Sequence, residues 1–136
     1  MSVGNSIVSA MLRSPVHRVL SGSTDLVRYQ GRRSGRTITT PTQYAPHGDD
    51  IVVMVGHHER KTWWRNFRTE HDADVLVKGE WRPVRARAVI GTDEPATIAP
   101  LLDTYLDRFP RAGRALGAGP RPQQDLRAVV VWCRPR

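Results

Sequence analysis

The sequence predicts an α+β fold in which six mostly antiparallel strands form a barrel with flanking helices. Short runs rich in β-branched residues are separated by turns that contain glycine and proline, and they do not alternate regularly with helices as a doubly wound sheet requires. Several of these runs pair off as hairpins around short polar turns. With 136 residues, the chain has the size of one domain with one hydrophobic core. We therefore expect a single domain over residues 1–136.

Each expected strand is identified by its side-chain pattern. Residues 51–55 are wholly apolar, which suits a strand that is buried on both faces beneath a helix. Residues 81–90 alternate apolar residues with Arg85 and Arg87, so one face of that strand is apolar and the other is basic. A turn is expected at residues 46–49. The six expected strands are 26–30, 37–44, 51–55, 73–77, 81–90 and 128–132.

Three segments are expected to be helical, and one is expected to be a loop. An N-terminal helix over residues 1–22 has apolar residues at helical spacing. A second helix over residues 62–70 places its aromatic residues on one side, with Thr62 as its cap. A third helix starts at the acidic, proline-containing signal of residues 92–95. The Gly/Pro/Arg-rich residues 113–122 are expected to be a mobile connector.

The chain carries a formal net charge of +8, because it has 21 Lys and Arg residues against 13 Asp and Glu residues. Such an excess favours an anionic partner: a nucleic acid, an acidic membrane surface, or a small molecule with phosphates or carboxylates. The membrane alternative rests on Arg13, His17 and Arg18, which would bring the N-terminal helix to lipid headgroups as a peripheral contact. The charge alone does not choose between these partners.

Cysteine usage and hydropathy indicate a cytoplasmic protein. Cys133 is the single cysteine, so neither an intrachain disulfide nor a cysteine-based metal site can form. No pattern of carboxylates or cysteines accompanies the adjacent His57 and His58, and we expect no metal site. The sequence lacks the apolar stretch of a secretion leader or of a membrane span.

Residues 31–36, Gly-Arg-Arg-Ser-Gly-Arg, place three guanidinium groups, one hydroxyl group and two glycines at a turn between strands. Arginine offers paired donors to phosphate or carboxylate, and glycine lets the backbone approach an anion closely. The turn therefore predicts an anion-binding cradle. Taken by itself it also fits a solvated basic surface loop, which is the commoner structure for such a turn.

Residues 31–36, followed by Thr39-Thr40-Pro41 and Tyr44, resemble the signature of the deazaflavin-dependent nitroreductase family, in which a basic turn of this type precedes a T-x-P strand. The resemblance continues through the apolar strand into residues 63–67, Trp-Trp-Arg-Asn-Phe, and it covers roughly residues 24–91. The fold that it implies is a split β-barrel of the FMN-binding type.

The resemblance implies a cofactor and a reaction. It implies coenzyme F420, a 5-deazaflavin with a phospholactyl-oligoglutamate tail, and hydride transfer from its reduced form to a small conjugated acceptor such as a quinone or a nitroaromatic compound. The cofactor carries the difficult chemistry, so no catalytic side chain is required. We expect one of Trp63 and Trp64 to pack inward and the other to border the cleft. The implied cofactor-binding residues are Arg32, Arg33, Ser34, Arg36, Thr40, Pro41, Lys61, Thr62, Trp63 and Asn66.

The acceptor side of the site is expected around Tyr44, His57 and His58. Where many relatives have a small-residue Ser-x-Gly-Gly segment, this chain has residues 56–60, Gly-His-His-Glu-Arg, which alters the substrate range that the resemblance implies. Adjacent histidines on a strand point to opposite faces, so at most one would face the cleft. There an imidazole would donate a proton to the reduced product, and elsewhere it is an ordinary turn histidine.

Alternatives to an F420-dependent reductase remain open. A split-barrel protein could bind FMN in place of the deazaflavin, or could carry the cofactor without turning over. A basic nucleic-acid-binding module is suggested by the aromatic and basic residues of segment 60–68. No RNP-like or helix-turn-helix pattern accompanies that segment, and we expect no specific nucleic acid as a partner. A monomer and a homodimer are both compatible with the sequence.

Overall fold

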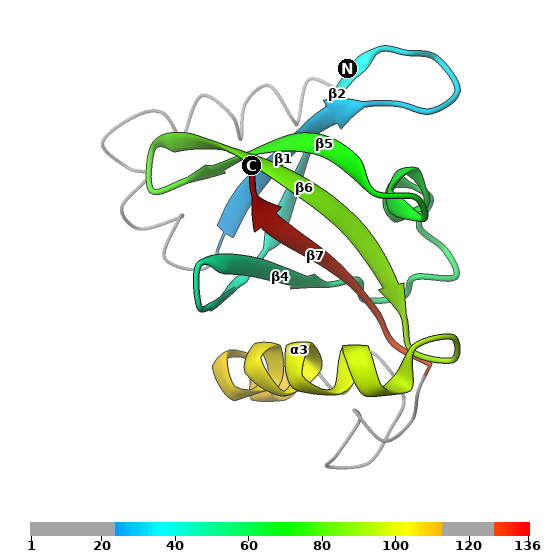
Figure 1. The fold of residues 1–136 in the computed structure, drawn as a ribbon, viewed down its shortest axis with the longest axis vertical. Coiled ribbons are helices and arrows are strands. Elements are labelled where there is room, and N and C mark those ends of the chain that lie inside the picture. The colour runs from blue at the N-terminus through cyan, green and yellow to red at the C-terminus, as the bar shows by residue number, and fades with distance from the viewer. Residues whose placement is uncertain (1–23, 113–126) are drawn as a thin grey trace.

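The computed structural model describes residues 24–112 and 127–136. The helix expected over residues 1–22 and the connector expected over 113–122 lie outside the described residues, and the single-domain organisation stays a prediction. Seven strands, the 3-10 helix η1 and the α-helix α3 lie within them, together with a 3-10 turn at 110–112 (Figure 1). In chain order these are β1 Thr24–Gln30, β2 Thr37–Gln43, β3 Ala45–His47, β4 Asp50–Met54, η1 Trp63–Phe67, β5 His71–Val77, β6 Glu80–Ile90, α3 Pro95–Arg108 and β7 Val129–Pro135.

The strands form one antiparallel sheet in the order β2-β1-β5-β6-β7-β4-β3. The sheet curls, as Figure 1 shows, so that β2 at one end comes into contact with β4 near the other end. The sheet order gives no ladder between β2 and β4, and the barrel is therefore split along this line. This arrangement confirms the expected α+β split β-barrel.

The sheet has one strand more than the six that the sequence predicts. A turn is expected at 46–49, but Ala45–His47 pairs with β4, and the turn consists of Gly48 and Asp49 alone. Gly48 has a φ of 62°, which a tight hairpin turn demands and glycine adopts without steric cost. Pro46 is tolerated because β3 is an edge strand, where a missing N–H need not break a ladder. Strand pairing, which local composition does not reveal, explains the error.

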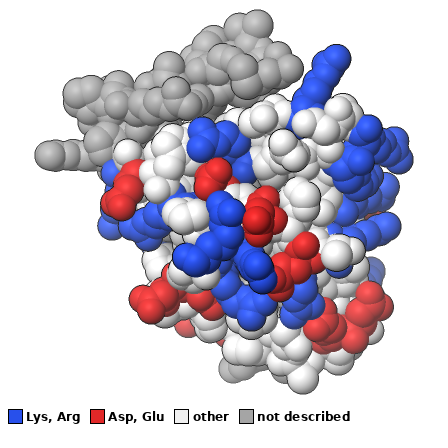
Figure 2. Space-filling view, turned by 45° about the horizontal axis from the view of Figure 1, so that its top comes forward, with Lys and Arg blue, Asp and Glu red and all other residues white. Residues whose placement is uncertain are grey.

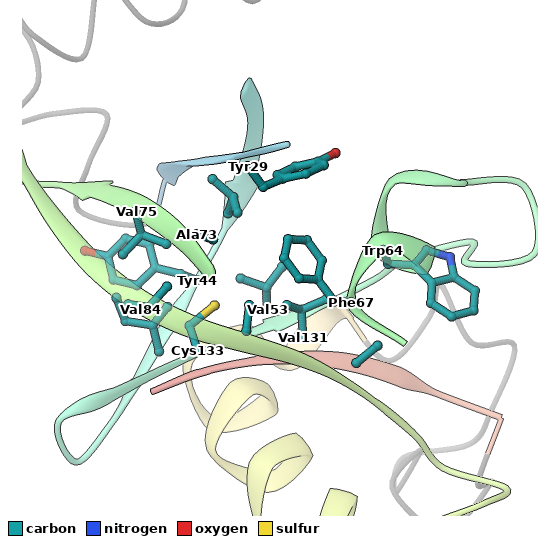
Figure 3. Packing of buried hydrophobic residues seen from close by; sticks show 14 of the residues in the cluster. Tyr29, Tyr44, Val53, Trp64, Phe67, Ala73, Val75, Val84, Val131 and Cys133 are labelled. Atoms are coloured by element: carbon teal, nitrogen blue, oxygen red, sulfur yellow. The ribbon is translucent and has the colours of Figure 1, made fainter. Parts of the chain in front are cut away.

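One hydrophobic cluster fills the inside of the curled sheet. Alternate residues of β1, Val27 and Tyr29, point into it, together with alternate residues of β5, β6 and β7. Figure 3 shows Phe67 in the middle of this cluster, below Tyr29, while Trp64 lies at its margin. The rings of Tyr29 and Phe67 meet edge to face, with centroids 5.0 Å apart. The 3-10 helix η1 therefore supplies a central core residue.

A second cluster lies between the sheet and α3. Ile98, Leu101 and Leu102 of α3 pack against Val52 and other outward-facing residues of the sheet. Because alternate residues of β4 belong to the inner cluster, this strand is buried on both faces, as its apolar run predicts. Figure 1 shows α3 lying along the sheet near β4 and β7. No helix among the described residues is long and apolar enough to cross a membrane.

Strand β6 has the two-faced character that its alternation predicts. Val84, Ala86 and Ala88 face the inner cluster, while Arg85 and Arg87 lie on the opposite face, which the buried Val89 shares. Arg85 lies 3.5 Å from Glu70, and Arg87 lies 2.6 Å from Glu94. The basic face of β6 is thus balanced by neighbouring carboxylates.

The expected helix over 62–70 is wrong in type and length. The structure has a single 3-10 segment, Trp63–Phe67, and the Thr62 side chain forms no capping hydrogen bond. Three aromatic residues in five leave few positions with high helix propensity, and Phe67 is held by the core and not by a helical ladder. A segment this short has no appreciable macrodipole, so it adds no preference for anions of its own.

The role of Phe67 in the core can be tested against Phe109, the other phenylalanine of the chain. Phe67→Ala should lower the free energy of unfolding by about 3–5 kcal/mol, because a fully buried ring leaves a cavity. Phe109→Ala should cost clearly less, since that ring is partly exposed at the end of α3. Urea unfolding followed by circular dichroism measures both. Equal losses would contradict the central position of Phe67.

Candidate cofactor site

The turn between β1 and β2 is held in one shape by its own backbone. The Gly31 N–H donates to the Arg36 carbonyl at 2.8 Å, and the Gly35 N–H donates to the Gly31 carbonyl at 2.9 Å. Gly35 has a φ of 69°, in the left-handed region that favours glycine. Ser34 Oγ accepts from the Arg36 N–H at 3.2 Å. The two glycines of the basic segment therefore shape the turn, and its arginines extend from a defined backbone.

Asn66 ties this turn to η1. The Arg32 N–H donates to Asn66 Oδ1 at 2.7 Å, and Asn66 Nδ2 donates to the Trp63 carbonyl at 2.7 Å. The amide thus bridges two segments that are 34 residues apart along the chain. This side chain, which is expected to contact the cofactor, already uses both ends of its amide on the protein. Its observed contacts position the arginine turn beside Trp63.

The arginines of the turn differ from those elsewhere on the surface. Within the described part of the chain, Arg32, Arg33 and Arg36 form no ion pair, while Arg85 and Arg134 both pair with Glu70. Figure 2 shows basic and acidic side chains interleaved over the centre of the visible face, with basic side chains less accompanied toward one margin. Uncompensated guanidinium groups that cluster in one turn favour an anionic ligand.

A cavity of about 320 Å³ opens beside this turn, and we call it the basic cavity. A second cavity, of about 410 Å³, lies where β2 approaches β4 along the split of the barrel, and we call it the split cavity. Trp63 lines both, so the two adjoin at this residue. Both are of the size typical of small-molecule sites. Together they offer a compartment lined by two arginines joined to a larger one whose described lining contains no arginine.

The two cavities collect the expected cofactor residues, with one exception. Arg36 lines neither of them. Of the expected residues, those that line the basic cavity are Arg32, Arg33, Ser34, Thr40, Thr62, Trp63 and Asn66. The expected residues that line the split cavity are Pro41, Lys61 and Trp63. Sequence reasoning missed the rest of the split-cavity wall, which includes Thr42, Met54, Val55 and Tyr105.

The two tryptophans divide as expected. Trp64 is buried, and its Nε1–H donates to the His58 carbonyl at 2.9 Å. Trp63 is half-buried and lines both cavities. Trp64 therefore anchors the 56–60 segment to the core, which leaves Trp63 available to a ligand.

The three residues assigned to the acceptor side do not line either cavity. Tyr44 is buried in the inner cluster, where loss of hydration raises the pKa of its phenol. His57 and His58 lie in a turn and not on a strand, so the alternation argument does not apply to them. His57 is exposed with a φ of 54°, and His58 packs edge to face against Trp64. Of the 56–60 segment, Gly56 lines the split cavity.

A third cavity, of about 600 Å³, lies beside β1 and β5 but is a poor candidate for an anion site. Its charged walls compensate one another. Arg136 pairs with Asp72 at 3.2 Å and with Asp74 at 3.1 Å, and Arg28 lies 3.5 Å from Asp74. Surface pairs of this kind are already satisfied, and they leave no excess charge for a ligand.

Asp25 is a buried carboxyl group that the sequence reasoning overlooked. It is fully buried, and burial raises its pKa from 3.8 to about 7, although a hydrogen bond from Thr42 opposes that rise. Its Oδ2 has no hydrogen-bond partner among the described residues. The available signal was alternation: Asp25 shares the inward face of β1 with Val27 and Tyr29.

The bridging role of Asn66 predicts a local change at one amide. Asn66→Ala removes the acceptor for the Arg32 N–H, so hydrogen exchange at the Arg32 amide should accelerate markedly. The free energy of unfolding should fall by about 1–2 kcal/mol, from two lost hydrogen bonds. Asn66→Asp keeps an acceptor oxygen and should preserve protection at Arg32 while losing the bond to Trp63. Unchanged exchange in Asn66→Ala would show that Asn66 does not hold the turn.

The raised pKa of Asp25 predicts a pH-dependent stability. Because the folded state binds this proton more tightly than the unfolded state, stability should fall as the pH rises from about 4 to 7 and level off above that. In Asp25→Asn this contribution is absent, so the Tm of the variant relative to wild type should climb over the same interval. Asp103→Asn on the exposed side of α3 is the control, and it should leave the pH dependence unaltered. Differential scanning calorimetry at a series of pH values measures these Tm values. A Tm difference between Asp25→Asn and wild type that stays constant with pH would refute the predicted contribution of Asp25.

Two solved structures resemble this fold. An F420-H2 dependent reductase, FDR-A, has a TM-score of 0.62 at 14% identity, covering 82% of this chain and 93% of that one. The heme storage protein HutZ from Vibrio cholerae has a TM-score of 0.55 at 12% identity, covering 91% of this chain and 90% of that one. At such low identity these likenesses establish the split-barrel fold and nothing about ligands.

Sequence comparison identifies the family. The model of the F420H2-dependent quinone reductase family matches residues 9–108, which is most of the chain. A Mycobacterium tuberculosis protein, Rv3178, named as a candidate F420H2-dependent quinone reductase, is 31% identical over 88 residues that make up 62% of this chain and 73% of that protein. The family-model match includes the basic turn and, apart from Ala112, the described residues that line both cavities. The chain therefore belongs to the F420H2-dependent quinone reductase family, a family of oxidoreductases whose cofactor is coenzyme F420.

Proposed function

We propose that this chain binds the anionic tail of F420 in the basic cavity, places the deazaflavin ring in the split cavity and reduces a quinone there. The observation that carries the proposal is the junction at Trp63, where uncompensated arginines meet a larger, less charged compartment. F420 joins a polyanionic tail to a flat ring, so its two parts match the two compartments. When bound in its reduced form, the cofactor supplies a hydride.

The basic cavity fits the tail by charge and by shape. Arg32 and Arg33 offer bidentate donors to phosphate and carboxylate oxygens, and the Ser34 hydroxyl adds a neutral one. A Cβ built on Gly31 would lie 2.7 Å from Ile38 Cδ1, so glycine keeps this wall free of a side chain. Arg36 lies outside the cavity lining, and we assign it a longer-range electrostatic role. Lys61 supplies a cation from the opposite side, at the split cavity.

The split cavity fits a flat ring and a small acceptor. Pro41 and Trp63 offer flat surfaces against which a ring stacks, and Val53, Met54 and Val55 of the facing wall keep water away from it. Excluding water matters because the transferred hydride must reach the acceptor and not a solvent proton. Gly56 leaves room at the rim of this cavity, and we place the acceptor there.

The residues assigned to the acceptor from the sequence keep narrower proposed roles. His57 is exposed in the turn that follows the Gly56 rim, where it would contact an acceptor that extends out of the cavity. His58 would act indirectly, through the turn that Trp64 anchors. Tyr44 would act from the core, as a neighbour of Asp25. A nitroaromatic compound is a second acceptor class of similar size and planarity.

The alternatives have less support. FMN has a phosphate but a shorter anionic chain, and it would leave part of the arginine cluster unmatched. A cofactor carrier has no need for an open space beside the ring, which the split cavity provides. Nucleic-acid binding would use basic and aromatic side chains on an open surface, yet Trp64 and Phe67 are buried. A peripheral membrane contact, a cytoplasmic location and the choice between monomer and homodimer stay predictions.

The assignment of the tail can be tested by charge-matched pairs of substitutions. Arg32→Ala with Arg33→Ala should weaken F420 affinity more than about tenfold, because each charge-assisted hydrogen bond contributes about 1.5–3 kcal/mol. Arg85→Ala with Arg134→Ala removes the same charge from the ion-paired surface and should change affinity little. Fluorescence titration of F420 measures all three proteins.

Arg36→Ala separates a binding contact from general electrostatics. Since Arg36 lies outside the cavity lining, its loss should weaken affinity much less than the loss of Arg32 and Arg33 together.

If both double variants bind F420 as tightly as the wild type, the basic cavity is not the tail site. If the two weaken binding equally, overall charge and not the turn attracts the cofactor.

A further inference from the structure

Asp25 and Thr42 form a cross-strand pair on the inner face of the barrel. They are directly opposite each other in the β1–β2 ladder, and Thr42 Oγ1 donates a hydrogen bond to Asp25 Oδ1. Thr42 lines the split cavity, while Asp25 lies behind it with no exposed surface. Among the described residues, the hydrogen bond that links this carboxyl to the wall of the cavity is therefore the one from the Thr42 hydroxyl.

The surroundings of Asp25 are polar but offer it no cation. Tyr44 after β2, Tyr105 of α3 and Cys133 of β7 are the titratable groups that face it. Burial raises the pKa of each of them, that of Tyr105 to about 12, so all three are neutral near pH 7. Among the described residues no Lys or Arg forms an ion pair with Asp25. Among these four groups of the described residues, Asp25 is thus the one able to exchange a proton near neutral pH.

We propose that Asp25 is the internal proton source for the reduced acceptor, and that Thr42 relays its proton into the split cavity. The inference rests on the proposed function, because it requires a quinone to be reduced in that cavity. It assigns a role to two residues that neither the basic turn nor the arginine cluster explains. Asp25 does not touch the acceptor, so it acts through Thr42 and positions the proton.

The proton balance of quinone reduction calls for such a donor. The quinone receives a hydride with its electron pair, which forms a C–H or O–H bond and leaves a hydroquinone monoanion or its tautomer. The anionic oxygen then takes the Thr42 hydroxyl proton, and Thr42 Oγ1 takes the Asp25 carboxyl proton, so the threonine ends neutral. Asp25, now a carboxylate, regains a proton from water or from the proton that oxidation of F420 releases. The net change is one hydride and one proton added to the quinone.

The properties of the pair suit this role. A carboxyl with a pKa of about 7 is a stronger acid than a hydroquinone oxygen and still holds its proton in a substantial fraction of molecules at neutral pH. In the protonated form its O–H can donate to Thr42 Oγ1, which frees the threonine hydrogen to point into the cavity. That proton sits on Oδ1, the oxygen in contact with Thr42 Oγ1, while Oδ2 has no hydrogen-bond partner among the described residues. An apolar pair would stabilise the barrel at lower cost, so stability alone does not explain a buried carboxyl here.

Steady-state kinetics on the full chain with F420H2 and menadione test the relay. In wild type, kcat should be high below pH 7 and fall above it, because the acid form is active. Asp25→Asn keeps the shape and cannot supply a proton, so its kcat should fall at least about tenfold and lose that pH dependence, since general-acid catalysis contributes about 10²–10⁴-fold. F420 affinity should be unchanged. Equal kcat and equal pH profiles for Asp25→Asn and wild type would overturn the proposal.

Substitutions at Thr42 separate the relay from a structural pair. Thr42→Val removes the hydroxyl at nearly constant volume and should lower kcat about as much as Asp25→Asn does, while Thr42→Ser should restore it. Thr37→Val, at the exposed start of the same strand, is the control and should behave as wild type. If Thr42→Val keeps the wild-type kcat and pH profile, the hydroxyl is not the relay. If Thr42→Val folds well and keeps its activity, the proposal is contradicted even if Asp25→Asn folds poorly.

A measurement without turnover checks the donor itself. The ¹³C carboxyl resonances of aspartate-labelled protein should include one that titrates near pH 7 and is missing in Asp25→Asn. Thr42→Val should move that titration to higher pH, because the lost hydrogen bond favoured the carboxylate. If wild type neither binds F420 nor reduces menadione, the proposed function fails. If wild type does both and no carboxyl titrates near pH 7, only the role of Asp25 fails.

Discussion

The incomplete closure of the barrel is the constraint on which the site depends. Antiparallel ladders link all seven strands, from β2 at one edge of the sheet to β3 at the other, yet the contact between β2 and β4 has no ladder. A closed ladder would fill the space between these strands with backbone hydrogen bonds. Because it is left open, the inner face of β2 forms a wall of both cavities, and Thr40 and Thr42 on that face line a cavity instead of pairing with a neighbouring strand.

The open seam would be unstable without support on each side. Beneath it, α3 covers the outer face of β4 with a cluster of fully buried apolar side chains. Beside it, η1 inserts Phe67 into the barrel and holds Trp63 at the junction of the two cavities. The Asn66 amide then joins η1 to the arginine turn. The packing of α3 and of Phe67 thus supports the strands that border the gap, while the hydrogen bonds of Asn66 set the position of the arginine turn beside the basic cavity.

The basic residues of the molecule fall into two groups, those that form ion pairs and those that do not. Most arginines of β6 and β7 pair with carboxylates across the outer face of the sheet, and they contribute little beyond solubility. The turn at 31–36 has no such partners among the described residues. Among the described residues a single carboxyl, Asp25, is buried, and it lies behind the split cavity. In the proposed function the uncompensated positive charge serves the anionic tail, and in the proposed relay the buried acid serves the reacting end.

By itself the sequence determined the features that depend on neighbouring residues. Alternation in 81–90, the apolar run at 51–55 and the glycines of 31–36 predict strands, a doubly buried strand and a turn, because side-chain direction and glycine conformations follow from local geometry. Tertiary structure decided the rest. It shortened the 62–70 helix to a 3-10 segment, made a strand of Ala45–His47, and turned Asn66 toward the backbone, because packing and pairing partners come from distant parts of the chain. Only the β1–β2 register and the folding of the barrel over Asp25 bring an acid to the cavity, since an aspartate in a β-rich run says nothing about what buries it.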